Sequence, residues 1–293
     1  MREVSAVITT YKRAPELLER AILSILAQTY PIKELIVVDD SPADYPLRAS
    51  VAETVGKYAD RGVRYIQHPT NMGACVARNT GAAACECDYI AFLDDDDEWM
   101  PEKIEKQLNK ATDNIALIYC GYKAIYEGIG KSVIKDRKYR RGRVFEELIL
   151  ENIIGSTSFP LIKKSVFDAL GGFDPLMQSS QDLDLWLRIA REYEVDCVEE
   201  PLVIYHIHEG EQITKNHRKR IEGLSRIIEK NMDYLQQNKS ALWLRQMLIV
   251  PHYVANGQKK EAFALWCKCF ARCPFKFYGN ARYLCVILKG CLK

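Results

Sequence analysis

DYIAFLDDDDEWMPEKI, residues 88–104, is the stretch that decides the expected fold. Its residues 89–93 form a short apolar run rich in strand-forming side chains, which predicts a buried β-strand. Four aspartates, Asp94 to Asp97, follow this run directly, and Pro101 then opens a helix. The stretch therefore places four carboxylates at the carboxyl end of a strand.

These four carboxylates support two interpretations. Like charges packed so closely repel one another and raise each other's pKa unless a cation lies among them. Carboxylate oxygens are hard ligands suited to magnesium or manganese, and magnesium commonly combines one or two carboxylates with substrate phosphates. One interpretation is thus a Mg²⁺ or Mn²⁺ site that serves a phosphorylated substrate. The other is a solvated acidic turn that caps the following helix.

The composition limits the classes of protein to which the chain can belong. Its 293 residues are 48% hydrophobic and 27% charged, which is typical of a globular protein with a large core. The formal net charge of +2 argues against a nucleic-acid partner. The apolar runs are too short for a signal peptide or a membrane span. We therefore expect a cytoplasmic protein, or one on the cytoplasmic face of the membrane, whose ten cysteines are thiols.

Strand-like and helical patterns alternate along the first third of the chain. This alternation is typical of an α/β fold with a doubly wound parallel sheet, in which ligands bind beyond the carboxyl ends of the strands. Residues 9–11, 39–40 and 94–97 all follow predicted strands, so their polar side chains are expected at one edge of the sheet. The predicted strands are 4–8, 35–38, 63–66 and 89–93, and the predicted helices between them are 15–26, 50–61 and 73–84.

The sequence lacks the common phosphate-binding loops. Neither a GxGxxG fingerprint after the first strand nor a GxxxxGK[ST] motif occurs. A metal at the aspartates, together with Arg78, could neutralise a diphosphate instead. The alternative for Arg78 is an ordinary surface ion pair.

Six short segments then give the chain a specific resemblance. They are VITTYKR, IVVDDS, NMGACVARNTG, FLDDDDEW, GGFD and QDLDLWLR, and their order and approximate spacing between residues 3 and 210 resemble those of the family 2 glycosyltransferases. The resemblance implies a GT-A fold, in which a Rossmann-like nucleotide-binding half, with a mixed sheet flanked by helices, is joined to an acceptor-binding half.

The resemblance also implies how a nucleotide sugar is bound. Thr9, Tyr11 and Asp39 would hold the base and the ribose, with Asp39 accepting a hydrogen bond from the uracil imide of a UDP-sugar. Arg78 would lie beside the base or the phosphates. Asp95 would lie near the donor sugar.

Metal ligation is implied for the acidic stretch and for a late histidine. Asp94 and Asp96 match the ends of the family's DxD motif, with Asp96 the expected direct ligand of Mn²⁺ or Mg²⁺ and Asp94 shared between the metal and the donor. His208 resembles the family's histidine near the diphosphate or metal. Strand alternation would place His206 and His208 on one face, and the alternative is one packed and one exposed histidine.

Asp182 is the expected catalytic residue. Residues 183–190 have helical spacing, so Asp182 lies at a helix start, where N-capping alone explains an acid. By the resemblance, Asp182 occupies the family's catalytic-base position, where it would take the proton from an acceptor hydroxyl. Gln181 stands where the family has a companion acid, and Asp184 is expected to be structural.

Two basic regions are expected outside the parallel sheet. Residues 131–143 carry seven basic residues and one acid, which indicates a solvated mobile loop or a contact with an anionic acceptor or membrane.

We expect a glycosyltransferase domain at residues 1–215 and a helical region at 216–293. After Gly257 this region mixes eight basic residues with aromatic ones. The mixture is compatible with helices on an anionic membrane and with an appendage packed on the catalytic domain or on a second subunit of a homodimer.

The expected function is that of a metal-dependent, inverting glycosyltransferase. It would move a sugar from a nucleotide diphosphate sugar to a hydroxyl of a glycan or lipid-linked acceptor in surface polysaccharide assembly. A nucleotidyltransferase would need a glycine-rich phosphate-gripping segment near the first strand, which VITTYKR does not supply. A sugar-nucleotide-binding module without transfer activity would keep Asp39 and Asp96 but would not need Asp182.

Overall fold

The computed structural model describes residues 2–135, 137–207 and 216–291. The chain divides into two compact units, the first containing Met1–Pro175 and Leu185–Glu209 and the second containing Leu176–Asp184 and Gly210–Lys293. Helix α7 (Gln181–Glu192) crosses this division, so its first turn belongs to the second unit and its remainder to the first.

The first unit is built on a mixed β-sheet, to which nine strands of the described residues contribute. Strands β3, β2, β1 and β4 are parallel neighbours, as the alternating pattern predicted. Beyond β4 the sheet becomes mixed, because β8 is antiparallel to both β4 and β6 while β6 and β9 are parallel. The strands are β1 (Val4–Thr10), β2 (Glu34–Asp39), β3 (Val63–Gln67), β4 (Tyr89–Asp94), β5 (Glu98–Trp99), β6 (Ile115–Tyr126), β7 (Lys131–Ile134), β8 (Leu161–Lys163) and β9 (Glu194–Ile207).

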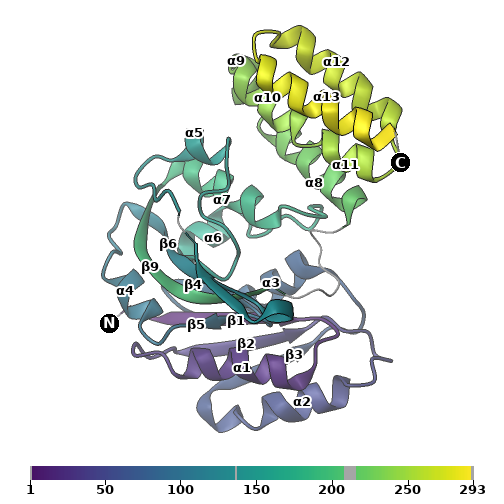
Figure 1. Ribbon diagram of the computed structural model, residues 1–293. Coiled ribbons are helices and arrows are strands. Elements are labelled where there is room, and N and C mark those ends of the chain that lie inside the picture. Colours follow the sequence, from purple (N-terminus) through teal and green to yellow (C-terminus); the bar gives the residue numbers. More distant parts are fainter. Residues whose placement is uncertain (1, 136, 208–215, 292–293) are drawn as a thin grey trace. The chain divides into compact units, whose positions relative to one another are not determined.

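Helices cover both faces of the parallel half, which explains why its strands are almost continuously apolar. Helices α1 (Pro15–Leu26) and α2 (Arg48–Gly56) lie along one face, and α3 (Ala74–Ala83) lies along the other (Figure 1). Gly81 lets α3 approach the side chain of Val7 in β1 closely, since a Cβ atom there would overlap it. The charged residues of β2 and β4 stand at the ends of these strands.

The shorter helices of the first unit connect these strands. The predicted helix at 50–61 is in fact α2 followed by a separate 3₁₀ turn, because the helix breaks after Gly56, a residue of low helix propensity. The helix predicted to open at Pro101 begins two residues later. These elements are η1 (Ala59–Arg61), α4 (Lys103–Leu108), η2 (Glu127–Ile129), α5 (Phe145–Leu148) and α6 (Lys164–Ala169).

Residues 131–143 are only partly the solvated loop that their charge predicted. Residues 131–134 form β7 on the edge of β6. The half-buried Arg137 has its guanidinium carbon 5.3 Å from the ring centroid of Tyr122 and donates to the carbonyl oxygen of Ile153 at 2.7 Å. A cation–π contact and a backbone acceptor therefore hold this cation inside the fold.

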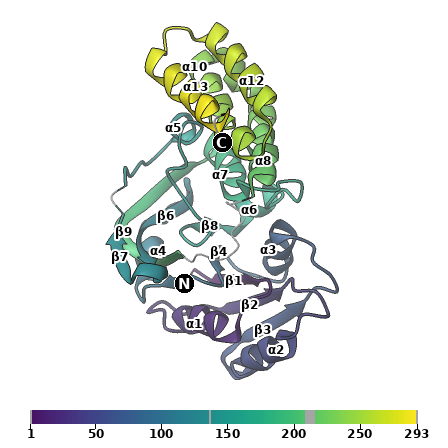
Figure 2. The same cartoon turned by 45° about the vertical axis from the view of Figure 1, so that its right-hand side comes forward.

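The second unit contains a helical bundle in which α12 contacts α10, α11 and α13 (Figure 1 and Figure 2). Its core includes Trp243 and Met247 of α10 and Cys269 of α12. The C-terminal helical region expected from the sequence is thus confirmed. Among the described residues, no helix combines the length and the apolar character that crossing a membrane requires. The helices are α8 (His217–Lys230), α9 (Met232–Gln237), α10 (Lys239–Met247), α11 (Val250–Ala255), α12 (Lys259–Arg272) and α13 (Phe277–Cys291).

Candidate functional site

The register of the sheet brings the predicted polar residues to one edge. Thr9 pairs with Asp94 across β1 and β4, and Thr10 pairs with Asp39 across β1 and β2. Because these strands are parallel, their carboxyl ends meet here. Tyr11 follows β1 directly, and its side chain is exposed. One edge of the sheet therefore carries Thr9, Tyr11, Asp39 and Asp94. We expected this from their positions at or just after the ends of predicted strands.

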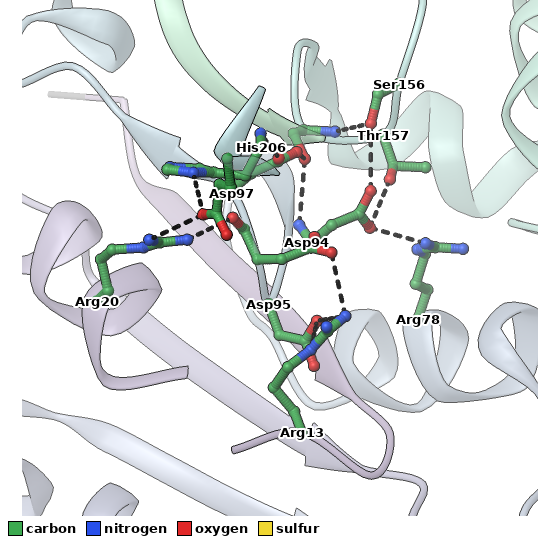
Figure 3. Close-up of polar contacts among 12 residues, drawn as sticks. Arg13, Arg20, Arg78, Asp94, Asp95, Asp97, Ser156, Thr157 and His206 are labelled. Atoms are coloured by element: carbon green, nitrogen blue, oxygen red, sulfur yellow. Dashed lines mark hydrogen bonds and ion pairs between the residues drawn. The ribbon is translucent and has the colours of Figure 1, made fainter. Parts of the chain in front are cut away.

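Asp94 is held by three side chains. Nη2 of Arg78 and the hydroxyl of Thr157 each donate to its Oδ1 at 2.9 Å, and the hydroxyl of Ser156 donates to its Oδ2 at 3.2 Å (Figure 3). Burial alone would raise the pKa of Asp94, but the Arg78 charge and these hydrogen bonds outweigh burial and lower the pKa below its ordinary value. Asp94 is therefore an ionised carboxylate. Arg78 is not a surface residue, since its side chain is only 11% exposed.

Asp95 and Asp96 share one arginine that the sequence interpretation missed. Nε of Arg13 donates to Oδ1 of Asp95 at 2.9 Å, and Nη2 of Arg13 donates to Oδ2 of Asp96 at 3.1 Å (Figure 3). The available signal was the position of Arg13 in VITTYKR, just beyond the end of β1. Burial raises the pKa of Asp95, whereas the side chain of Asp96 is 26% exposed. Asp96 is thus the more accessible carboxylate of the two, which suits a direct metal ligand.

The fourth aspartate, Asp97, has a different environment. The Ser158 hydroxyl donates to its Oδ2 at 2.6 Å, and the backbone N–H of His206 donates to its Oδ1 at 3.2 Å. Burial, and then the charges of Asp94 and Asp96, raise the pKa of Asp97 well above its ordinary value. Asp97 therefore joins the end of β4 to β9, and the four acids are not equivalent.

Of the two histidines near the end of β9, His206 and His208, the structure describes only His206. His206 is buried in β9, with Nε2 2.8 Å from an oxygen of Glu98 and Nδ1 2.9 Å from an oxygen of Glu127. These two carboxylates make His206 a packed, paired histidine. His208, the predicted metal ligand, lies outside the described residues, so its role stays a prediction.

Asp39 at the end of β2 is fully buried. Its Oδ1 accepts from the N–H of Ser41 at 2.9 Å, and its Oδ2 accepts from the Tyr65 hydroxyl at 2.7 Å. Burial and this hydrogen bond raise the pKa of Tyr65. Each carboxylate oxygen can accept a second hydrogen bond. Recognition of a base by Asp39 nevertheless stays a prediction.

Asp40, which the sequence interpretation left without a role, fixes the start of α3. Its two oxygens accept from the backbone N–H groups of Met72 and Gly73, both at 2.8 Å, and Nδ1 of His68 lies 2.8 Å from its Oδ1. Gly73 has a φ of +89°, which a glycine adopts without strain. Asp40 thereby positions the helix that carries Arg78.

The GGFD segment supports the same helix. The Asn79 side chain in α3 makes two hydrogen bonds with the backbone of Phe173. Arg188 of α7 donates to the carbonyl of Gly172 at 2.7 Å. The guanidinium carbon of Arg78 lies 5.4 Å from the Phe173 ring centroid. Three of the motif segments therefore meet behind Arg78 and hold it in place.

Asp182 lies in the first turn of α7, within the second unit. A helix start is electrostatically favourable for an acid. Asp184, two residues further on, is buried and paired with Lys230, which confirms the structural role predicted for it. The catalytic role of Asp182 stays a prediction.

The carboxylates at the end of β4 fit a hard divalent cation. Asp94, Asp95 and Asp96 offer oxygen ligands only, and the buried Oδ2 of Asp95 has no well-oriented hydrogen-bond partner among the described residues. Within residues 2–135, 137–207 and 216–291, no three His, Cys, Asp or Glu side chains form a complete metal-binding group. These aspartates would supply one or two carboxylate ligands to such a cation, and substrate phosphates would complete its ligand set.

Known glycosyltransferases are similar to this chain over 64% to 87% of its length. The family model described as glycosyl transferase family 2 matches residues 5–171. An uncharacterized glycosyltransferase of Haemophilus influenzae is 32% identical over 212 residues, which cover 70% of this chain and 68% of that protein. WcaA of Escherichia coli strain K12, assigned by its name to colanic acid biosynthesis, is 29% identical over 280 residues, or 87% of this chain and 95% of WcaA. TuaG of Bacillus subtilis strain 168, assigned to teichuronic acid biosynthesis, is 27% identical over 190 residues, or 64% of this chain and 72% of TuaG.

A solved structure shares the fold. The crystal structure of S. aureus TarS matches with a TM-score of 0.59 and 15% sequence identity over 86% of this chain and 43% of the TarS chain. This chain thus spans less than half of TarS, and the likeness confirms the expected GT-A architecture. Because the family model also covers more than half of the sequence, the chain belongs to glycosyl transferase family 2.

Proposed function

We propose that this glycosyltransferase is inverting and metal-dependent, and that its donor is a nucleotide diphosphate sugar, with UDP-sugar the expected class. The observation that carries the proposal is the ion pair between Asp94 and the buried Arg78, with the partly exposed Asp96 two residues further on. Carboxylates for a cation and a fixed guanidinium for phosphate are thereby combined at the carboxyl ends of parallel strands.

In this proposal the reaction is a single displacement. Asp182 takes the proton from the acceptor hydroxyl, and the hydroxyl oxygen attacks the anomeric carbon from the face opposite the diphosphate. The bond from the anomeric carbon to the diphosphate oxygen breaks as the new glycosidic bond forms, and Arg78 balances the charge that develops on the leaving group. Asp96 and Asp94 would hold Mn²⁺ or Mg²⁺, which when bound would further stabilise that charge.

The remaining predicted residues orient the donor. Thr9, Tyr11 and Asp39 hold the nucleoside, Asp95 lies toward the donor sugar, and His208 contributes to the metal or the diphosphate. The strand register supports this assignment for Thr9 and Asp39, because both stand at the carboxyl ends of the paired strands β1 and β2.

The relatives support a role in surface polysaccharide assembly. WcaA is assigned to colanic acid biosynthesis and TuaG to teichuronic acid biosynthesis. We therefore propose a hydroxyl of a growing glycan, or of a lipid-linked acceptor, as the site of transfer.

The test is a panel of sugar nucleotides with and without Mn²⁺, assayed for transfer and for slow release of nucleoside diphosphate. Asp96→Ala should abolish the metal-dependent activity. Asp182→Asn should abolish transfer and leave donor binding by calorimetry unchanged. Asp60→Ala, at an exposed acid in η1, serves as the control. Binding without turnover would indicate a sugar-nucleotide-binding module, and unchanged transfer by Asp182→Asn would remove that residue from its role.

We further propose that the second unit attaches the protein peripherally to the cytoplasmic face of a membrane. The α12–α13 connection and the start of α13 expose Phe275 (87%), Phe277 (66%) and Tyr278 (95%) to solvent. From residue 262 to 291 the sequence has no acid. Exposed aromatic rings among lysines and arginines suit an anionic lipid surface, where the rings enter the interface and the cations contact headgroups. Together with the exposed Lys268, Arg282 and Lys289 of α12 and α13, these rings are called the aromatic–basic surface.

A further inference from the structure

We infer that Arg13 is an exchangeable counter-ion of the aspartate cluster, which competes with a divalent cation for the carboxylates of Asp95 and Asp96. The inference rests on the proposed function, because the cation concerned is the one proposed for that site. It deepens the proposal by naming the residue that controls when the cation can bind.

The contacts of Arg13 place a positive charge on both acids. Its Nη2 lies 2.8 Å from Oδ1 of Asp95 and 3.1 Å from Oδ2 of Asp96. A guanidinium only donates hydrogen bonds and stays protonated. A magnesium ion would approach the same oxygens to about 2.1 Å. Since two cations repel at close range, a metal held by Asp96 competes with this guanidinium for the carboxylate.

The surroundings of Arg13 allow its side chain to leave while its backbone stays. The Tyr45 hydroxyl donates to the carbonyl oxygen of Arg13 at 3.1 Å, and the preceding Lys12 N–H donates to the Ser41 hydroxyl at 2.8 Å. These bonds hold the loop after β1. The Arg13 side chain is 30% exposed, so it can turn toward solvent without unpacking the core.

Arg78 provides the contrast. Its side chain is 11% exposed, its guanidinium lies over the Phe173 ring, and its helix is fixed by Asp40. Removing Arg78 from Asp94 would therefore disturb packing, whereas removing Arg13 from Asp96 would not. Among the described residues, the ion pairs of Asp94, Asp95 and Asp96 thus include a buried arginine, Arg78, and a more exposed one, Arg13, which we infer to be exchangeable.

This arrangement predicts that removal of the Arg13 charge changes protein stability and metal affinity in opposite directions. The buried Asp95 loses a charge partner, so the protein without metal should become less stable. The incoming cation no longer has to displace a charge, so its affinity should rise. A purely structural arginine would lower stability and leave metal affinity unchanged or weaker.

The experiment titrates the full-length chain with Mn²⁺ alone and follows free Mn²⁺ by electron paramagnetic resonance. Arg13→Ala should bind Mn²⁺ about tenfold more tightly than wild type, in the range of typical coupling effects. Arg13→Lys, which keeps the charge, should lie closer to wild type. Arg64→Ala removes the same charge from an exposed site on β3 and should leave the affinity unchanged. Arg13→Gln provides a second neutral variant should the alanine variant fail to fold.

The Mn²⁺ affinity of the neutral Arg13 variants decides whether Arg13 competes with the cation. A folded neutral variant that binds Mn²⁺ no more tightly than wild type overturns the competition. If transfer still needs metal in that case, only this inference fails and the proposed function stands. If neither wild type nor variant binds Mn²⁺ while transfer proceeds without metal, the competition and the proposed metal dependence fail together.

Discussion

The side chain of Asn79 and the backbone of Phe173 form a closed pair of hydrogen bonds. The Asn79 amide donates to the carbonyl oxygen of Phe173 at 2.7 Å and accepts from its N–H at 2.9 Å. Helix α3 and the GGFD turn are joined there, one residue from Arg78, whose guanidinium lies over the same Phe173 ring. A change at Asn79 is therefore expected to affect both stability and the position of Arg78.

Asn79→Ala should lower the free energy of unfolding by about 2–3 kcal/mol, because it removes two hydrogen bonds and leaves two backbone groups of Phe173 without these partners. Urea denaturation measures the loss. Asn79→Asp keeps the acceptor for the Phe173 N–H but turns a carboxylate oxygen toward the Phe173 carbonyl oxygen, so it should also be less stable than wild type. An alanine variant as stable as wild type would show that this pair does not hold the turn.

The two glycines of the GGFD turn form a matched pair. Gly171 has a φ of +74° and Gly172 a φ of +65°, so an alanine is strained at both. Among the described residues, an added Cβ meets nothing within 4 Å at Gly171, but at Gly172 it comes within 2.6 Å of Oδ1 of Asn79. We expect Gly171→Ala to cost about 1–2 kcal/mol and Gly172→Ala about 2–4 kcal/mol. Thermal denaturation of both variants measures the difference, and equal losses would mean that Asn79 moves aside freely.

Lys103 in α4 predicts a pH dependence of stability. It is fully buried, with Nζ 2.8 Å from Oε1 of Gln107 and 4.2 Å from the Trp99 ring centroid. Burial lowers the pKa of Lys103 to about 8. The unfolded chain, in which lysine titrates near about 10.4, holds more protons between these two values. Stability should therefore rise as the pH increases from 8 to about 10.4.

Lys103→Met tests this sign, because it removes the penalty of burying a charge. The variant should be more stable than wild type by about 1–3 kcal/mol at pH 7, and the difference should vanish as the pH approaches about 10.4. Lys110→Met, at an exposed position just after the same helix, should change little. A Lys103→Met variant whose difference from wild type is the same at pH 7 and pH 10 would contradict the account.

The aromatic–basic surface predicts binding to anionic vesicles. The full-length chain should sediment with phosphatidylcholine vesicles that contain phosphatidylglycerol, and less with phosphatidylcholine alone. Neutralising Lys268, Arg282 and Lys289 should weaken this binding about 100-fold at low salt, at about 1 kcal/mol for each charge. Phe275→Ser with Phe277→Ser should also weaken it, because the rings no longer enter the interface.

The control for the vesicle experiment is a pair of exposed apolar residues in the first unit. Ile129 and Ile134 are 72% and 64% exposed, so Ile129→Ser with Ile134→Ser removes a comparable apolar area. This variant should bind vesicles like wild type. A different outcome is that the protein does not bind vesicles and light scattering shows a homodimer. If the Phe275 and Phe277 substitutions then dissociate the dimer, the aromatic–basic surface is a subunit interface instead.

Much of the fold could be predicted because its strands are short apolar runs that end in polar residues. Such runs identify β1, β2, β3 and β4, and helical spacing identifies α1, α7 and the C-terminal helices. The parts that sequence patterns did not reveal depend on tertiary contacts. The first half of β9 and the edge strand β7 are stabilised by pairing with β6, and local composition does not encode that pairing.

The sequence was sufficient to predict at which edge of the sheet the candidate site lies. Parallel strands bring their carboxyl ends together, so Asp39 and Asp94 were expected to meet. The distinct partners of the four aspartates could not be predicted. The four side chains are identical, and the sequence does not show in which direction each of them points. Arg13 and Ser158 reach the cluster across 82 and 61 residues of chain, a separation at which one sequence gives no contact information.

Helix α3 is secured at its start by Asp40 and in its middle by Asn79. A mutant library that randomises residues 72–79 to obtain new donor preferences should therefore return mostly misfolded proteins. The neighbouring loop that carries Arg13 is the safer target for directed evolution, because its side chains can vary while its backbone bonds persist.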